Sequence, residues 1–208
     1  MSTFIAIDSS DATDTQAASS YREGNVYPYL ESKGFAMSPF FGPLARRGFV
    51  APAAASPGVT LLTGAGHGTY TSFIGFNFEP VYAVDAYATP EVSGKIAHFL
   101  SCDNALYLGP NFVKNGCLAY IGYDDNFTFD PDSADIFFKC DGQIDCGLAD
   151  GLTVGDAVGR AKDVFNQAIA DLRAQGNTYA ASVLTVNLSH LRSPLDGSQW
   201  GRVDAKLS

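Results

Sequence analysis

The sequence predicts a single α/β domain built around a mostly parallel central sheet. Short apolar runs alternate with segments of helical periodicity, which is the order expected when helices cover both faces of a parallel sheet. The length of 208 residues fits one domain. With 46% hydrophobic and 17% charged residues, the chain has enough apolar side chains to form a hydrophobic core. We therefore expect a three-layer α/β/α sandwich over residues 1–208.

The expected strands are apolar or rich in β-branched residues and are bounded by glycine or polar residues. They lie at residues 3–7, 35–41, 59–63, 95–101 and 117–123. Alternating aromatic residues around Gly75 predict a small hairpin over residues 70–82. The polar segment that follows the first strand, residues 9–20, is expected to be a loop.

The expected helices begin or end at recognisable capping residues. Gly34 ends a short helix, Pro43 begins another, and Thr153 caps a long amphipathic one. Helices are expected at residues 25–33, 43–55, 104–114, 153–175 and 179–191, the last with a strand as the alternative. Residues 126–150 show no clear periodicity, so we interpret them as a long loop insertion.

The charge balance narrows the classes of partner. The chain has 22 acidic and 13 basic residues and a net charge of −9, which disfavours binding to nucleic-acid phosphates. No apolar run is long enough to cross a bilayer, and the start lacks the features of an export signal. These features predict a cytoplasmic protein that binds neither nucleic acid nor a membrane.

The four cysteines do not form the pattern of a disulfide scaffold or of a zinc site. Cys117 lies in an apolar run and is expected to be a core thiol. Cys140 and Cys146 bracket the segment CDGQIDC, which we interpret as a loop with either a local disulfide or two free thiols.

Two reactive side chains follow two of the predicted buried strands. His67 lies in a Gly-His-Gly sequence and Cys102 in a Ser-Cys-Asp sequence, and parallel strands bring their carboxyl ends to one edge. A thiol nucleophile needs an imidazole within reach, and the neighbouring glycines free N–H groups for an oxyanion. A helix beginning just after Cys102 would lower the thiol pKa. A Cys-His dyad is the interpretation we prefer to an inert thiol beside a tight turn.

The same segments resemble the clan of cysteine peptidases that includes caspases, gingipains, clostripain and legumain. The matching sequences are VTLLTGAGHG, KIAHFLSCDN and the gingipain-like NFVKNGCLAYIGY, within a similarity in strand order over about residues 1–125. The resemblance implies a caspase-hemoglobinase-like fold and a cysteine endopeptidase that forms a thioester on Cys102, with His67 as acid and base. It also implies an oxyanion hole from the N–H groups of Gly68 and Cys102, a peptide or protein substrate, and no cofactor.

The chain departs from the clan's best-known specificity motifs. It lacks the caspase Gln-Ala-Cys-x-Gly string, so a preference for Asp is not implied, and Leu100 stands where clostripain-like members have Asp. Asp124 and Asp125 end a strand, as Asp8 does, and these three carboxylates predict a basic P1 residue. The alternative is an apolar pocket lined by aromatic residues, namely Tyr70, Phe73 and Tyr123.

Other candidates carry weaker signals. His98 alternates within its strand and is interpreted as a packed residue rather than a second base. The carboxylates of DPDSAD (Asp130, Asp132 and Asp135) have calcium-loop spacing without the later Glu and Gly, so a helix cap is the alternative to calcium. Two other functions stay open: an inactive interaction module with this fold, and a thiol amidase or acyltransferase that acts on a small molecule.

Overall fold

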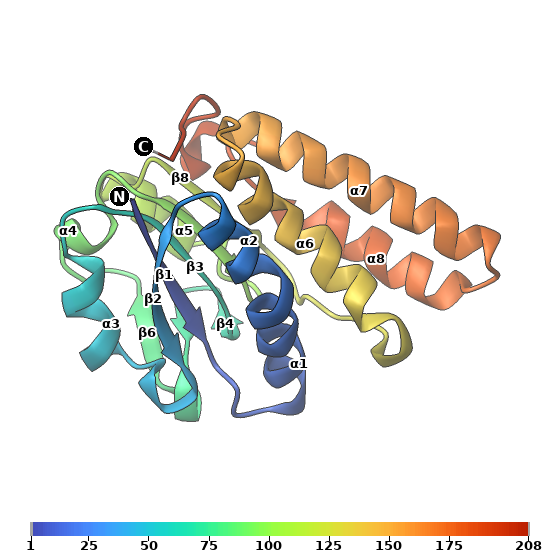
Figure 1. Cartoon of the computed structure of the whole chain (residues 1–208), viewed down its shortest axis with the longest axis horizontal. Coiled ribbons are helices and arrows are strands. Elements are labelled where there is room, and N and C mark those ends of the chain that lie inside the picture. The colour runs from blue at the N-terminus through green and yellow to red at the C-terminus, as the bar shows by residue number, and fades with distance from the viewer. Residues whose placement is uncertain (1, 208) are drawn as a thin grey trace.

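A computed structural model describes residues 2–207 as a three-layer α/β/α sandwich (Figure 1). The central sheet has the strand order β2-β1-β3-β7-β8-β9, in which all pairings are parallel except that of β8 with β9. The strands are β1 (Thr3–Asp8), β2 (Ala36–Phe41), β3 (Val59–Ala65), β7 (Ile96–Leu100), β8 (Ala119–Tyr123) and β9 (Leu191–Arg192). The predicted fold class and the five long strands are confirmed.

Helices cover both faces of this sheet, as Figure 1 shows. One face carries α1 (Thr13–Tyr21), a π-helical turn (Arg22–Val26), α2 (Tyr27–Ser32) and α6 (Ala134–Ala149). The opposite face carries α3 (Arg47–Ala54), α4 (Thr89–Val92) and α5 (Leu108–Lys114). Two further helices, α7 (Val154–Ala174) and α8 (Thr178–His190), pack beside α6 around a third apolar cluster.

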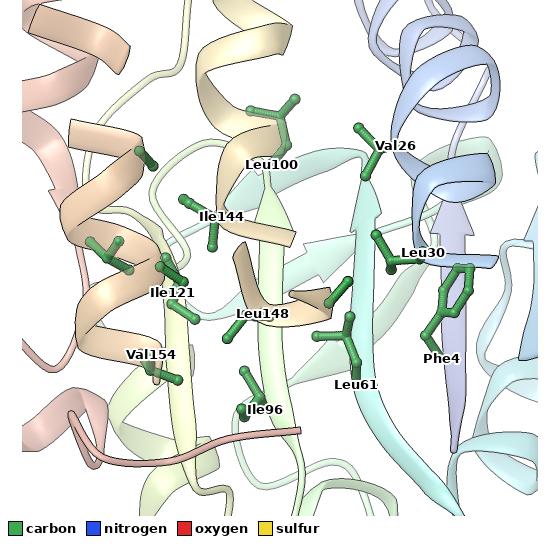
Figure 2. Close-up of a cluster of buried hydrophobic side chains, with 14 of the residues drawn as sticks. Phe4, Val26, Leu30, Leu61, Ile96, Leu100, Ile121, Ile144, Leu148 and Val154 are labelled. Carbon is green, nitrogen blue, oxygen red and sulfur yellow. The ribbon is translucent and has the colours of Figure 1, made fainter. Parts of the chain in front are cut away.

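Alternate residues of the strands enter two separate cores. Phe4 packs with the α1, α2 and α6 layer, whereas Ile5 packs with the α3 and α5 layer, because successive side chains of a strand point to opposite faces. Figure 2 shows the first core, where Phe4, Leu61, Ile96 and Ile121 from four strands lie close to Leu30, Ile144 and Leu148. Both faces are buried, which explains why the strands are continuous apolar runs.

A small antiparallel sheet extends from the tip of β3. It consists of β4 (His67–Thr69), β5 (Ser72–Ile74) and β6 (Pro80–Ala83), so the predicted hairpin is part of a three-stranded unit. Gly66 makes the link, and a Cβ there would lie 2.5 Å from the carbonyl oxygen of Ile74. Only glycine fits this close approach of two backbones.

Three sequence-based expectations about local structure are wrong. The predicted loop at residues 9–20 contains most of α1, and the helix expected from residue 104 begins only at Leu108. The predicted loop insertion at 126–150 contains the sixteen-residue helix α6. Periodicity failed to identify α6 because Asp141 and Asp145 occupy fully buried positions on it. Cys140 and Cys146 are therefore free thiols on a helix and not loop residues.

The predicted signals at Gly34 and Thr153 are confirmed, but the prediction that Pro43 begins a helix is wrong, because Pro43 lies in a separate 3-10 turn (Gly42–Leu44) and α3 begins only at Arg47. Gly34 has a φ of 91°, the left-handed conformation that ends the α2 segment, and Thr153 accepts a hydrogen bond from the N–H of Asp156 at the start of α7. Residues 178–190 are helical, so the strand alternative for that segment is wrong. Within residues 2–207, no helix has the length and apolarity needed to cross a membrane.

Candidate active site

The register of the sheet brings His67 and Cys102 to the same edge. Ala65 of β3 pairs with Leu100 of β7. His67 follows Ala65 by two residues, and Cys102 follows Leu100 by two residues. The N–H of Gly66 donates to the carbonyl of Leu100 over 3.2 Å and continues the pairing past the strand ends. Both reactive residues line one cavity of about 90 Å³ beside the first turns of α1.

Gly68 lies directly against the backbone of Cys102. A Cβ on Gly68 would stand 1.9 Å from the carbonyl oxygen of Cys102 and 3.0 Å from its nitrogen. No side chain other than hydrogen fits there without displacing the main chain. This contact makes the backbone groups of Gly68 and Cys102 immediate neighbours.

Asp11, which sequence reasoning missed, is the acidic neighbour of His67. Its Oδ1 lies 3.9 Å from Nε2 of His67, while its Oδ2 accepts a 2.7 Å hydrogen bond from the N–H of Asn77. The hydroxyl of Ser9 donates a short hydrogen bond to the same carboxylate. Partial burial acts to raise the pKa of Asp11, but these hydrogen bonds and the nearby imidazole outweigh it and lower the pKa. A negative charge therefore faces the imidazole at neutral pH.

A strained turn holds an aromatic ring on the imidazole. The rings of His67 and Phe78 stack with their centroids 4.9 Å apart and their planes inclined by 19°. Asn77 and Phe78 both have a φ of 57°, a left-handed conformation that costs a non-glycine residue about 1–3 kcal/mol. Phe78 is nevertheless 64% exposed, so burial of its ring does not account for that strain.

The Cys102 thiol is neutral at neutral pH. Burial raises its pKa, a hydrogen bond with the backbone of Phe127 partly offsets this, and the charges of Asp103 and Asp125 raise it further. The expectation that a helix beginning just after Cys102 lowers this pKa is wrong, because α5 begins only at Leu108. A turn with Asp103 at a φ of 61° separates the thiol from that helix.

The three carboxylates predicted to bind a basic P1 residue do not line this cavity. Asp124 accepts 2.6 Å and 3.0 Å hydrogen bonds from Nε of Arg192 and Nδ1 of His190. Asp125 lies 3.6 Å from Nε2 of His190 and is half-exposed. Asp8 is fully buried, where it accepts hydrogen bonds from the hydroxyl of Tyr27 and the N–H of Ala65.

The aromatic residues of the alternative prediction are also elsewhere. Phe73 and Tyr123 are fully buried in the two cores, and exposed Tyr70 makes an edge-to-face contact with Tyr107. The cavity is instead lined by residues from α1, the strand tips, the segment that precedes α6, and α6 itself. Besides His67 and Cys102 these are Asp14, Thr15, Ala18, Ala65, Gly66, Leu100, Ser101, Phe127, Phe129 and Phe138.

Five ionisable groups form a buried charge cluster between α6 and the sheet: Asp8, Arg22, His98, Asp141 and Asp145. Arg22 lies 2.7 Å from Asp145 and 3.3 Å from Asp141, and the His98 nitrogens lie 3.1 Å and 3.3 Å from the same two carboxylates. Burial acts to lower the pKa of His98, but Asp145 and Asp141 raise it to about 9. His98 is thus a packed residue, as predicted, and it is positively charged.

The DPDSAD segment begins a helix. The hydroxyl of Ser133 donates to the carboxylate of Asp130 over 2.8 Å, and the segment forms a short 3-10 turn that leads into α6. Among residues 2–207 no group of three or more His, Cys, Asp or Glu side chains is arranged to hold a metal ion.

The chain matches no family model and no curated protein sequence. Among solved structures it is similar to the complex of the pro- and mature domains of RgpB, a gingipain from Porphyromonas gingivalis, with a TM-score of 0.55. The fold is caspase-like. The similarity covers 97% of this chain but 48% of that chain, so this chain spans about half its length. At 13% sequence identity, the likeness concerns the fold alone.

Proposed function

We propose that this chain is a cysteine endopeptidase in which Cys102 is the nucleophile and His67 the general acid and base. The observation that carries the proposal is the shared cavity at the carboxyl edge of the sheet, lined by both side chains. In open α/β sheets this edge is where ligands bind. Gly68 also lies against the backbone of Cys102, and we assign the N–H groups of these two residues to the oxyanion.

Attack and proton transfer would be coupled, because the resting thiol is neutral. As Sγ of Cys102 attacks the scissile carbonyl carbon, its proton passes to His67, and the carbonyl oxygen becomes an oxyanion. Collapse of this intermediate breaks the C–N bond, and the imidazolium protonates the departing amine. Water then attacks the thioester and gives a proton to His67, which returns it to the sulfur as the acid product leaves. These steps require no cofactor.

The surroundings of His67 suit an imidazole that becomes charged during the reaction. Its Nε2 faces Asp11, so Nδ1 is the nitrogen assigned to the substrate. The carboxylate of Asp11 favours the imidazolium by charge, and Phe78 presents a π-face at a distance within the roughly 6 Å of a cation–π contact. Asp11 and Phe78 are therefore positioning residues for His67.

One observation favours the alternative of an inactive interaction module, namely the raised pKa of Cys102. Reactive cysteines usually lie where the thiolate is stabilised. A neutral thiol can still act as the nucleophile if its proton passes to His67 during the attack, which happens only when a substrate is bound. Activity therefore has to be measured directly.

The test is hydrolysis of a peptide library that varies the P1 residue, using wild type, Cys102→Ala and the matched thiol control Cys146→Ala on α6. We expect cleavage by wild type and by the control, and none by Cys102→Ala. His67→Ala should lower kcat about a hundred- to ten-thousand-fold. Undiminished cleavage by Cys102→Ala would contradict the proposal. So would a wild-type protein that cleaves no peptide and whose Cys102 resists thiol-reactive probes.

A further inference from the structure

We propose that the cavity beside Cys102 is a P1 pocket for an aliphatic side chain of leucine or methionine size, so that the substrates are peptides cut after such residues. The inference rests on the proposed function, since it takes Sγ of Cys102 as the atom that attacks the peptide. It replaces the basic P1 residue predicted from Asp8, Asp124 and Asp125.

The walls of the cavity are apolar over most of their extent. Two phenylalanines from the segment between β8 and α6, and a third from α6 itself, face two small or aliphatic residues from the strand tips and one alanine from α1. They are Phe127, Phe129, Phe138, Ala65, Leu100 and Ala18. Such walls reward a side chain for leaving water, at about 25 cal/mol per Å² of apolar surface.

The one carboxylate of the cavity lies at its mouth. Asp14 is exposed in the first turn of α1, close to the sheet edge where that helix begins (Figure 1). Ala18 lies one turn farther along α1, away from the edge, and is only 5% exposed. A bound lysine or arginine would place its cation near Ala18 and the phenylalanines, where it would lose water and gain no partner.

None of the three acids predicted to bind such a cation lines the cavity. Asp124 is engaged by Arg192 and His190, and Asp8 lies in the buried charge cluster with Tyr27 and Ala65 as hydrogen-bond donors. An acidic P1 residue would meet the same apolar walls and be repelled by Asp14. The volume of about 90 Å³ suits one short side chain better than a bicyclic ring.

The first experiment compares two peptidyl chloromethyl ketones that differ only in P1, leucine or arginine, by the rate at which they alkylate Cys102 in the full chain. Mass spectrometry reads the modified residue. We expect the leucine reagent to react at least 10-fold faster, and equal rates or a faster arginine reagent would overturn the pocket assignment. Peptide hydrolysis, measured in parallel, tests the proposed function separately. A leucine preference in alkylation without hydrolysis would keep the pocket and refute the peptidase.

The second experiment changes the pocket. Ala18→Leu fills the floor and should invert the preference, so that a reagent with P1 alanine reacts faster than one with P1 leucine. Ser20→Leu adds the same side chain to an exposed position of α1 and should leave the wild-type ratio unchanged. Phe129→Ala enlarges the cavity and should raise the rate of a P1 phenylalanine reagent at least 5-fold relative to leucine. Unchanged ratios in folded Ala18→Leu or in Phe129→Ala would contradict the assignment.

Discussion

Raising the pH from 7 to 9 should remove about 2 kcal/mol of stability through His98 alone. Its pKa rises from an ordinary 6.5 to about 9 in the folded protein, mainly because Asp145 and Asp141 outweigh the burial that would lower it. The folded state therefore binds the proton more tightly, and the benefit is complete below pH 6.5 and is lost as the pH rises through 9. The full shift corresponds to about 3 kcal/mol, of which about two thirds falls between pH 7 and 9.

Urea denaturation followed by circular dichroism at pH 7, 8 and 9 would measure this loss in wild type and in His98→Gln. The neutral variant should be destabilised at pH 7 by about 3–5 kcal/mol, because Asp141 and Asp145 lose one of their partners. Its stability should then fall by about 2 kcal/mol less than that of wild type between pH 7 and 9. Burial raises the pKa of Cys117, Cys140 and Cys146 to about 12, so ionisation of these thiols near pH 9 favours the unfolded chain. This loss of stability is the same in both proteins and cancels in the comparison.

Two results would refute this reasoning. One is a pair of parallel stability curves for wild type and His98→Gln between pH 7 and 9. The other is an NMR titration in which the ring protons of His98 change with a midpoint below pH 7, because the imidazole would then be neutral in the folded protein. Either result would mean that Arg22 alone balances Asp141 and Asp145.

Three further predictions concern the site and its scaffold. Asp11→Asn should lower kcat about 10- to 100-fold with little change in KM and shift the pH-rate profile, and an unchanged profile would exclude its role in positioning His67. Gly68→Ala should reduce kcat/KM at least 100-fold, because the new Cβ displaces the backbone of Cys102. Its control Gly159→Ala, which meets no atom within 4 Å on α7, should instead raise the urea midpoint. Thr153→Ala removes the cap of α7 and should cost about 1 kcal/mol in urea denaturation, and no change would contradict the capping role.

The sequence predicted the strands and the common edge of His67 and Cys102 because each depends on local pattern and on one rule of parallel sheets. Helix α6 was not predicted because its aspartates are polar residues at buried positions. The partners that make their burial possible, Arg22 and His98, lie far away along the chain, so no local pattern indicates them. Separation along the chain also explains the wrong prediction for Asp124. In the sequence it looks like an unpaired carboxylate at a strand tip, but the fold brings Arg192 to it.

The two residues that we propose position His67 show the same limit. Asp11 lies in a polar run of SSDATD, and nothing local distinguishes it from its neighbours. Its place beside His67 becomes apparent only in the fold, where the N–H of Asn77 donates a hydrogen bond to its carboxylate. Phe78 is likewise one aromatic residue among many until a left-handed turn lays it on His67.

Helix α6 couples two traits that protein engineers usually treat as separate. Phe138 forms part of the cavity wall, and Asp141 and Asp145, on the following turns, tie the same helix to Arg22 and His98. Replacing a buried ion network with matched apolar residues is often neutral or stabilising, by about 1–4 kcal/mol. Here such a redesign would also remove the directional contacts that fix how far Phe138 reaches toward Cys102. Variants selected for heat resistance at this cluster would therefore drift in the width of the cavity, and with it in the range of side chains it accepts.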